Sequence, residues 1–292
     1  MLFEYDLKET EALIGWTYFL HAWNFPSSRE FVEKVTKVDA DASLSNDKDH
    51  EKTIQAISLI KDARELLQEL QESGFRTRSL LRLCKAQSQD DDLILDGRRL
   101  PLLRQQHPGK DGVCLCLSDF VRPESMGEDT VALFLATSDD SALLEKEKDP
   151  YRRLLLETLS DRLAEATAER LHLEVRRSLW GYARDENLET AQILEARYKG
   201  IRPAVGYPSL PDQSVNFILD EMLDFSSIGV SLTQSGAMHP HSSVSGLMIG
   251  HPESRYFSIG KIGEDQLEDY SRRRGMKVED MRRFLTQNLT TM

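Results

Sequence analysis

The sequence has no long apolar segment and very little cysteine. None of its apolar runs approaches the roughly 18 residues that a membrane-spanning helix needs, so we expect no contact with a membrane. The opening MLFEYDLKET lacks the basic-then-apolar order of a signal peptide. Among 3 cysteines, Cys114 and Cys116 have C-x-C spacing, which differs from the C-x-x-C of zinc and redox sites. We expect both to be buried thiols on one face of a strand, in a cytoplasmic protein.

Positive charge and the common nucleotide-binding motifs are also scarce. The 37 Lys and Arg residues are outnumbered by 49 Asp and Glu residues, which gives a net charge of −12. This balance argues against a nucleic-acid-binding protein, because such proteins usually carry a basic face. No G-x-G-x-x-G follows a strand pattern, and neither a Walker loop nor a G-x-S-x-G motif is present. The usual dinucleotide-binding, P-loop and nucleophile-elbow chemistries are therefore excluded.

Helical and strand patterns occur in alternating blocks. The apolar spacing predicts helices over 51–73, 150–182, 187–198 (with Asn187 as the cap), 214–225 and two closing segments, the first ended by Gly275. Short apolar runs predict strands over 78–87, 90–100 (with an Asp-Gly turn), 112–121, 130–138, 228–238, 242–250 and 255–262, and 37–50 is expected to be a loop. This order favours an α+β fold with a mostly antiparallel sheet over a doubly wound one.

The helix over 150–182 has an unusual apolar stripe. Its members recur at every fourth residue: Leu155, Leu159, Leu163, Thr167, Leu171, Val175 and Leu179. Each step of four turns about 400°, so the stripe drifts about 40° around the helix per step. The pattern predicts a central helix that packs against different partners along its length, unlike a coiled coil.

The stretch GIRPAVGYPSLPDQS, residues 200–214, is rich in proline and glycine and carries one arginine and one tyrosine. Proline excludes the middle of a helix or a central strand, so the stretch is a stiff, bent loop. By itself it is consistent either with a tight connection between helices or with a ligand-binding loop.

Two histidines and two arginine clusters have alternative interpretations. His239 and His241 would share one face of a strand and could bind a metal, but without a third ligand a surface or hydrogen-bonding role is favoured. The clusters in RRSLW and SRRRGM are interpreted as solvated faces, with a docking patch as the alternative.

Four segments together resemble a known family, the activation (reactivation) domain of cobalamin (vitamin B12)-dependent methionine synthase. They are GIRPAVGYPSLPD, LTQSGAM with PHSSVSG, HPESRYFSIGKIGEDQLEDYSRRRGM, and DRLAEATAERLH followed by WGYARDENL. The match is close over 150–290 and looser over 1–149, at WTYFLHAW and CLSDFV. The resemblance implies one domain over 1–292, with helices and strands in 1–149 and the ligand loop in 150–292. It implies a curved, mostly antiparallel sheet flanked by helices, with a long central helix.

The resemblance also implies binding of S-adenosylmethionine (AdoMet) in a shallow groove. Arg202 would hold the methionyl carboxylate, and the prolines around it would pre-set the loop. The expected cofactor-binding residues are Arg202, Ala204, Gly206, Tyr207, Tyr256 and Glu165. Among these, the Gly206 main chain would approach the ligand closely, the Ala204 main chain would contact the adenine, and Glu165 would face the ligand's cation.

The sequence departs from the family pattern at two acidic positions. Gly15 stands where the family has an aspartate that contacts the ligand, and Ala196 replaces a further acid, with Glu195 next to it. A charge-assisted hydrogen bond contributes about 1.5–3 kcal/mol, so each loss would weaken affinity roughly 10- to 100-fold unless Glu195 compensates. The sequence has no D-x-H-x-x-G cobalamin motif and no zinc-cysteine pattern for homocysteine.

The resemblance therefore implies a stand-alone component of 5-methyltetrahydrofolate-homocysteine methyltransferase in methionine biosynthesis, not a complete enzyme. Its partners would be a cobalamin-binding methionine synthase core and a flavodoxin-like electron donor, and cobalamin would be reached only through the partner. No catalytic side chain and no metal ligand are expected. One alternative is a docking or regulatory scaffold for a corrinoid protein that binds no AdoMet, and another is a metal hydrolase that uses His239 and His241.

Overall fold

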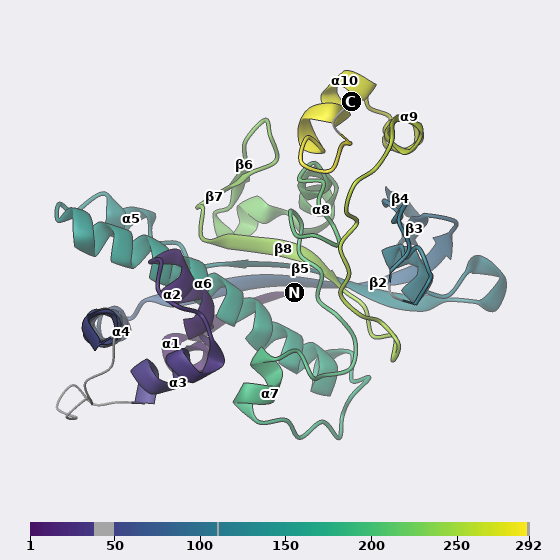
Figure 1. Ribbon diagram of the computed structural model, residues 1–292. Coiled ribbons are helices and arrows are strands. Elements are labelled where there is room, and N and C mark those ends of the chain that lie inside the picture. The colour runs from purple at the N-terminus through teal and green to yellow at the C-terminus, as the bar shows by residue number, and fades with distance from the viewer. Residues whose placement is uncertain (38–49, 110, 291–292) are drawn as a thin grey trace.

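The computed structural model describes residues 1–37, 50–109 and 111–290, and most of the loop predicted over 37–50 lies outside them. An antiparallel sheet runs through the molecule in the order β4-β3-β2-β5-β8, and β1 pairs with β2 beside this path. The strands are β1 (Leu2–Asp6), β2 (Arg76–Gln89), β3 (Asp92–Leu95), β4 (Arg98–Pro101), β5 (Asp129–Thr137) and β8 (Ser243–Met248). The sheet is curved, and helices cover both of its faces (Figure 1). The predicted α+β class and antiparallel sheet are confirmed.

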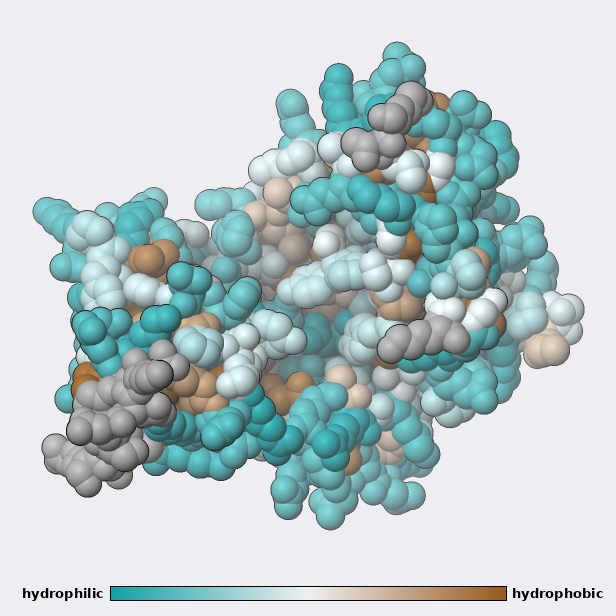
Figure 2. All heavy atoms as spheres, in the orientation of Figure 1, coloured by the Kyte–Doolittle hydropathy of each residue, from teal (hydrophilic) through white to brown (hydrophobic). Residues whose placement is uncertain are grey.

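Helices fill the spaces around this sheet. They are α1 (Leu7–Thr10), α2 (Trp16–Ala22), α3 (Arg29–Lys37), α4 (His50–Glu72), α5 (Ser141–Leu144), α6 (Pro150–Glu174), α7 (Thr190–Leu194), α8 (Val215–Leu223), α9 (Glu264–Arg274) and α10 (Val278–Phe284). No helix in the described ranges is long and apolar enough to cross a membrane. The hydrophilic residues cover most of the face drawn in Figure 2, and the hydrophobic ones are visible mainly in its recesses.

The two faces of β5 bury different sets of side chains. Leu133 and Leu135 belong to the apolar cluster under α8, whereas Ala132 and Phe134 belong to the cluster under α6. Successive side chains of a strand point to opposite faces, so β5, which is apolar from Val131 to Ala136, must be covered on both sides. The helices α6 and α8 provide this cover (Figure 1).

The long helix α6 changes partners along its length, as its stripe predicted. Leu159 and Leu163 pack in the cluster formed with the N-terminal helices, whereas Ala168 and Leu171 pack on the sheet. Between them, the Thr167 hydroxyl donates a hydrogen bond of 2.7 Å to the Thr77 hydroxyl on β2. After α6 the chain continues as a π-helical turn, η4 (Val175–Leu179).

Two predicted strands are wrong. Residues 117–120 form a 3-10 helix, η2 (Leu117–Phe120), because the Asp119 carboxylate accepts hydrogen bonds from the Cys116 amide and from Arg104. Cys116 is buried, but Cys114 is only half-buried. Residues 255–261 form no strand, since their backbone groups bond to separate segments, such as Ile259 to Pro208.

Two further predicted elements are much shorter than expected. The helix over 187–198 is reduced to α7, capped by Glu189 instead of Asn187, because Ala196 has a positive φ of 54°. The strand over 228–238 is replaced by the small ladder of β6 (Ser231–Leu232) and β7 (Met238–His239).

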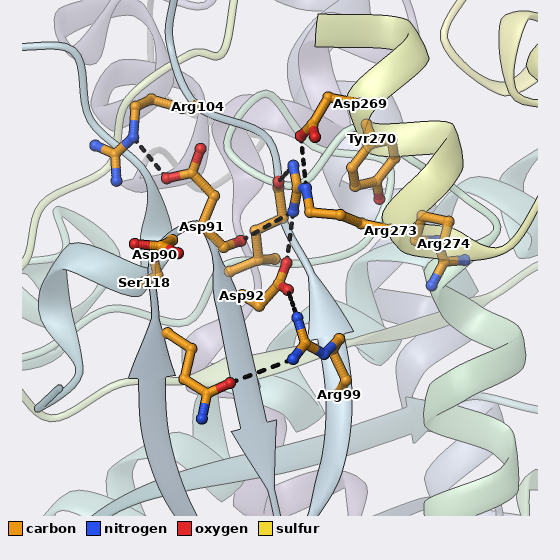
Figure 3. A network of polar contacts seen from close by, with 12 residues as sticks. Asp90, Asp91, Asp92, Arg99, Arg104, Ser118, Asp269, Tyr270, Arg273 and Arg274 are labelled. Atoms are coloured by element: carbon orange, nitrogen blue, oxygen red, sulfur yellow. Dashed lines mark hydrogen bonds and ion pairs between the residues drawn. The ribbon is translucent and has the colours of Figure 1, made fainter. Parts of the chain in front are cut away.

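Of the three arginines of SRRRGM, only Arg272 lies on a solvated face, and the interpretation was wrong for Arg273 and Arg274. The Arg273 side chain is 11% exposed and donates to Asp92 on β3 at 2.5 Å and to the Leu102 carbonyl at 2.9 Å. Asp92 also accepts from Arg99 on β4, so one buried carboxylate joins the β3–β4 hairpin to α9 (Figure 3). Arg274 is buried as well, and it donates to Ser214 at 2.7 Å.

Candidate functional site

The proline-rich loop extends the sheet beyond β8. The Ile201 amide donates to the Ile249 carbonyl at 2.9 Å, the Leu247 amide donates to the Pro203 carbonyl at 3.0 Å, and the Val205 amide donates to the Ser245 carbonyl at 2.9 Å. The loop can lie this close only because position 246 is glycine. A Cβ there would stand 2.2 Å from the Pro203 carbonyl oxygen. The loop is thus positioned by main-chain bonds along β8.

A cavity of about 760 Å³ opens between this loop, α6, the start of α2 and the segment after α7. This volume falls within the usual range for small-molecule sites. The residues that line it are Leu13, Gly15, Tyr18, Arg162, Glu165, Glu169, Ile193, Leu194, Glu195, Ala196, Tyr198, Arg202, Pro203, Ala204, Tyr207, Pro208, Ser209, Tyr256 and Phe257.

Arg202 is the most deeply buried cation of this lining. Its side chain is 11% exposed, and its Nη2 lies 3.2 Å from Glu169 and 3.4 Å from Glu165, which are one turn apart on α6. Burial lowers the pKa of Arg202, but the carboxylates of Glu169 and Glu165 outweigh it and hold that pKa above its ordinary value. Arg202 Nε is buried and has no hydrogen-bond partner among the described residues. The guanidinium is therefore permanently charged and retains an unused donor.

Two tyrosines, Tyr207 and Tyr256, lie near Arg202. The Tyr207 hydroxyl donates to Glu165 at 2.5 Å, and the Tyr256 hydroxyl accepts the Arg202 amide hydrogen at 2.9 Å. Burial and then the neighbouring Glu165 carboxylate raise the pKa of Tyr207, so its hydroxyl stays protonated as a donor. The side chains of Tyr207 and Tyr256 are both about half exposed, which leaves parts of their rings open to a ligand.

Gly15 and Ala196 both line the cavity, so the two departures from the family pattern fall at the site. Neither residue brings a carboxylate. Glu195 also lines the cavity, but its carboxylate pairs with Arg29 at 2.7 Å and with Arg197 at 2.6 Å. The charge that could replace the missing acids is therefore already neutralised by two arginines.

The structure brings together Glu165, Arg202, Ala204, Tyr207 and Tyr256. The sixth expected residue, Gly206, is not among the lining residues. It has a positive φ of 87°, and its amide donates to the Leu210 carbonyl, so glycine is explained there by a turn.

His239 and His241 lie elsewhere. The His241 side chain is almost fully exposed, and its Nδ1 lies 3.4 Å from the Asp161 carboxylate. The described residues contain no group of three or more His, Cys, Asp and Glu side chains arranged to hold a metal ion.

Several residues that line the cavity were not predicted from the sequence. Glu169 follows Glu165 by one helical turn, and this i, i+4 spacing on α6 is the signal that could have identified it. Arg162 precedes Glu165 by three residues on the same helix, and its guanidinium lies 6.0 Å from the centre of the Tyr18 ring. Tyr198 carries no such signal, because the chain reverses at Ala196 before reaching it.

Below the cavity lies a second layer of buried polar groups. The Arg176 side chain is fully buried and makes two bonds of 2.9 Å and one of 3.1 Å to the Glu186 carboxylate. Its guanidinium also lies 4.0 Å from the centre of the Tyr198 ring. His172 is buried too, and burial followed by the charges of Arg176 and Arg202 holds its pKa well below the ordinary value. Arg176 belongs to the RRSLW cluster, so a solvated face was wrong for this residue.

The fold and the cavity define a small-molecule-binding module built on a curved antiparallel sheet, with the ligand loop added along its edge. Comparison with known protein families identifies the family to which this module belongs. The model of the vitamin B12-dependent methionine synthase activation domain matches residues 6–275, and the chain belongs to this family. A solved structure, described as the MetH reactivation domain bound to AdoHcy, is similar at a TM-score of 0.88 and 33% identity. The alignment covers 100% of this chain and 90% of that one.

Proposed function

We propose that the cavity binds AdoMet and that the chain supports the reductive methylation of oxidised cobalamin in a partner methionine synthase. Family membership and the AdoHcy named for the similar structure support this assignment. The observation that carries it is the convergence of Arg202, Tyr207, Tyr256 and Ala204 on one cavity.

Each of these residues has a chemical part in the proposal. Arg202 offers a fork of donors to the methionyl carboxylate, including its unpartnered Nε. Tyr207 and Tyr256 offer ring faces to the adenosine and the sulfonium. The Ala204 main chain contacts the adenine, Gly206 allows the tight turn beside it, and Glu165 faces the ligand's positive charge.

The chain's contribution to the reaction is positioning. The ligand supplies the methyl group, and a flavodoxin-like protein supplies the electron that the partner's cobalt requires. Holding the methyl donor against the partner makes the transfer effectively unimolecular, so no side chain of this chain needs to act as an acid or base. The site of action is the cytoplasm, with the cobalamin-binding core as the partner.

A second candidate is a docking scaffold for a corrinoid protein that does not bind AdoMet. It is favoured by Gly15 and Ala196, which bring no carboxylate, and by the pairing of Glu195 with two arginines.

Calorimetric titration with AdoMet and with AdoHcy distinguishes the two candidates. We expect saturable one-to-one binding of both ligands. Arg202→Lys keeps the charge but removes the fork, and it should weaken binding by about tenfold or more. The matched control is Arg197→Lys, at an exposed arginine of the same segment that does not line the cavity. Absence of heat up to millimolar ligand would overturn the AdoMet site and favour the scaffold.

A further inference from the structure

The carboxylate of Glu169 lies between two arginines, one at the cavity and one beneath it. Its Oε2 is 3.2 Å from Arg202 Nη2. Its Oε1 is 3.6 Å from Arg176 Nη1 and 3.9 Å from His172 Nδ1. Glu169 Oε1, Arg176 Nη1 and His172 Nδ1 are all buried, and none of the three has a hydrogen-bond partner among the described residues. One half of the carboxylate is therefore engaged, and the other half faces two unused partners just beyond bonding distance.

Arg176 is held firmly in this position. Glu186 binds it through two oxygens, and Tyr198 packs against the face of its guanidinium. It lies in the π-helical turn η4, where the wider turn follows directly on the helix that carries Glu169. A fixed cation is thus present one layer below Arg202.

His172 can supply a second hydrogen-bond donor to the Glu169 carboxylate, in addition to Arg176. The Tyr182 hydroxyl lies 3.1 Å from His172 Nε2. Because a neutral imidazole has one donor and one acceptor nitrogen, a hydrogen bond from Tyr182 to Nε2 leaves the proton on Nδ1, the atom that faces Glu169.

An anionic ligand group at Arg202 would compete with the carboxylates that already contact this arginine, and a displaced carboxylate needs a new partner. Both protein carboxylates lie near the same atom, Nη2, so a ligand carboxylate that binds the fork formed by Nε and Nη2 competes with them for Nη2. Glu165 retains the Tyr207 hydroxyl when it leaves. Glu169, with a side chain 10% exposed, cannot turn to water, and a buried carboxylate without a partner is strongly unfavourable.

We propose that Arg176 is a positioning residue for ligand binding, which receives the Glu169 carboxylate when a ligand carboxylate occupies Arg202. The inference rests on the proposed function, since it requires an AdoMet-like ligand in this cavity. The movement needed is small, because Glu169 Oε1 is already 3.6 Å from Arg176. Arg176 touches no ligand and acts only through Glu169, together with His172.

The test combines two substitutions with two ligands. AdoHcy carries the carboxylate, and 5′-methylthioadenosine lacks it. Calorimetry on the full chain compares wild type, Arg176→Gln, Glu169→Gln and the double variant. We expect Arg176→Gln to weaken AdoHcy binding about tenfold and to change methylthioadenosine binding by less than about twofold. In the Glu169→Gln background the effect of Arg176→Gln on AdoHcy should fall to about twofold, because no carboxylate remains to be received.

If Arg176 only supports the structure of the cavity, Arg176→Gln should weaken the binding of AdoHcy and of methylthioadenosine equally. That result would overturn the proposal. The matched control is Arg177→Gln, at the exposed neighbour in the same turn, which should change neither affinity. If Arg176→Gln does not fold, Glu169→Gln tests the premise of the proposal, which is that the Glu169 carboxylate competes with the ligand for Arg202. Removing the charge of Glu169 should strengthen the binding of AdoHcy relative to that of methylthioadenosine. If the ratio of the two affinities is unchanged or shifts toward methylthioadenosine, the proposal is overturned.

The outcomes separate this inference from the function on which it rests. If the wild-type chain binds none of AdoMet, AdoHcy and methylthioadenosine, the proposed function fails and the inference fails with it. If wild type binds AdoHcy but the ratio of the two affinities is the same in Arg176→Gln, only the role of Arg176 is overturned.

Discussion

At the scale of single residues, Gly15 is a position where a substitution could change the charge of the cavity. It is the N-cap of α2, with a φ of −77° that any residue can adopt, and it lines the cavity. A Cβ at this position would stand 3.2 Å from Cδ2 of Tyr18, whose ring is mostly exposed and can move. The site can therefore accept a side chain here at little cost.

We predict that Gly15→Asp increases the preference for AdoMet over AdoHcy by about tenfold. The added carboxylate interacts with the sulfonium charge of AdoMet, which the thioether AdoHcy lacks. Calorimetry with both ligands measures the ratio of the two dissociation constants. Gly15→Asn is the matched control, since it has the same shape without the charge. Equal ratios in the two variants would contradict the prediction.

His172 should link stability to pH. Its pKa in the folded state lies well below the ordinary value of 6.5, so it is neutral in the fold and takes up a proton on unfolding once the pH is low. The stability is complete above about pH 6.5 and decreases as the pH falls from there toward the folded-state pKa, by up to about 1.4 kcal/mol per pH unit.

We therefore predict that His172→Gln flattens the pH dependence of stability below pH 6.5. Urea unfolding of both chains at several pH values between 7.5 and 5 gives the free energies of unfolding. The variant should be less stable at pH 7.5, and the difference from wild type should shrink as the pH falls. A constant difference across this range would show that His172 is not the group responsible.

At the scale of elements, the ligand loop depends on the strand beside it. Four main-chain bonds join residues 201–205 to residues 245–249, and Gly246 permits this approach. The motif SSVSG, noted for its resemblance to a family, thus has a physical explanation, because its glycine makes room for the loop that carries Arg202.

Gly246→Ala should displace the loop and weaken ligand binding. The added methyl group would stand 2.2 Å from the Pro203 oxygen and 2.8 Å from Ala204 Cα, and relieving such contacts typically costs about 1–3 kcal/mol or more. Thermal unfolding and AdoHcy affinity measure the two effects. Ser243→Ala, on the same strand but away from the loop, is the control. Wild-type affinity in Gly246→Ala would show that the loop does not depend on this contact.

At the scale of the whole molecule, α6 is shared by two apolar clusters. One contains the N-terminal helices with Trp16 and Trp23, and the other contains the sheet with Trp180. Because a single helix supplies side chains to both, neither cluster can lose α6 without exposing the other. This arrangement predicts that the two clusters unfold together.

We predict that Leu159→Ala lowers the stability of both clusters equally, by about 2–5 kcal/mol, although Leu159 belongs to only one of them. Variants that retain either Trp23 or Trp180 as the only tryptophan report each cluster by fluorescence during urea unfolding. The two midpoints should coincide and shift together. Leu154→Ala, at an exposed position of the same helix, should have little effect. Separate midpoints would contradict the shared role of α6.

Features that depend on neighbouring residues were predictable from the sequence. Gly275 ends α9 with a φ of 67°, and Asp96 and Gly97 form the turn between β3 and β4, because these backbone conformations favour glycine and aspartate. The fourfold spacing in 150–182 correctly predicted that α6 has different partners along its length. Five of the six expected site residues lie together because the family motifs carry them.

The tertiary structure alone decided the features that depend on partners far away in the sequence. The apolar run 112–121 has strand composition, but none of the described strands pairs with it, and Asp119 and Arg104 turn its second half into a 3-10 helix. Arg176 and Arg273 resemble surface residues in the sequence, and the carboxylates of Glu186 and Asp92 compensate for their burial in the fold. Local conformation follows from residues a few positions apart, whereas the burial of a charge depends on whether the fold brings an opposite charge to it.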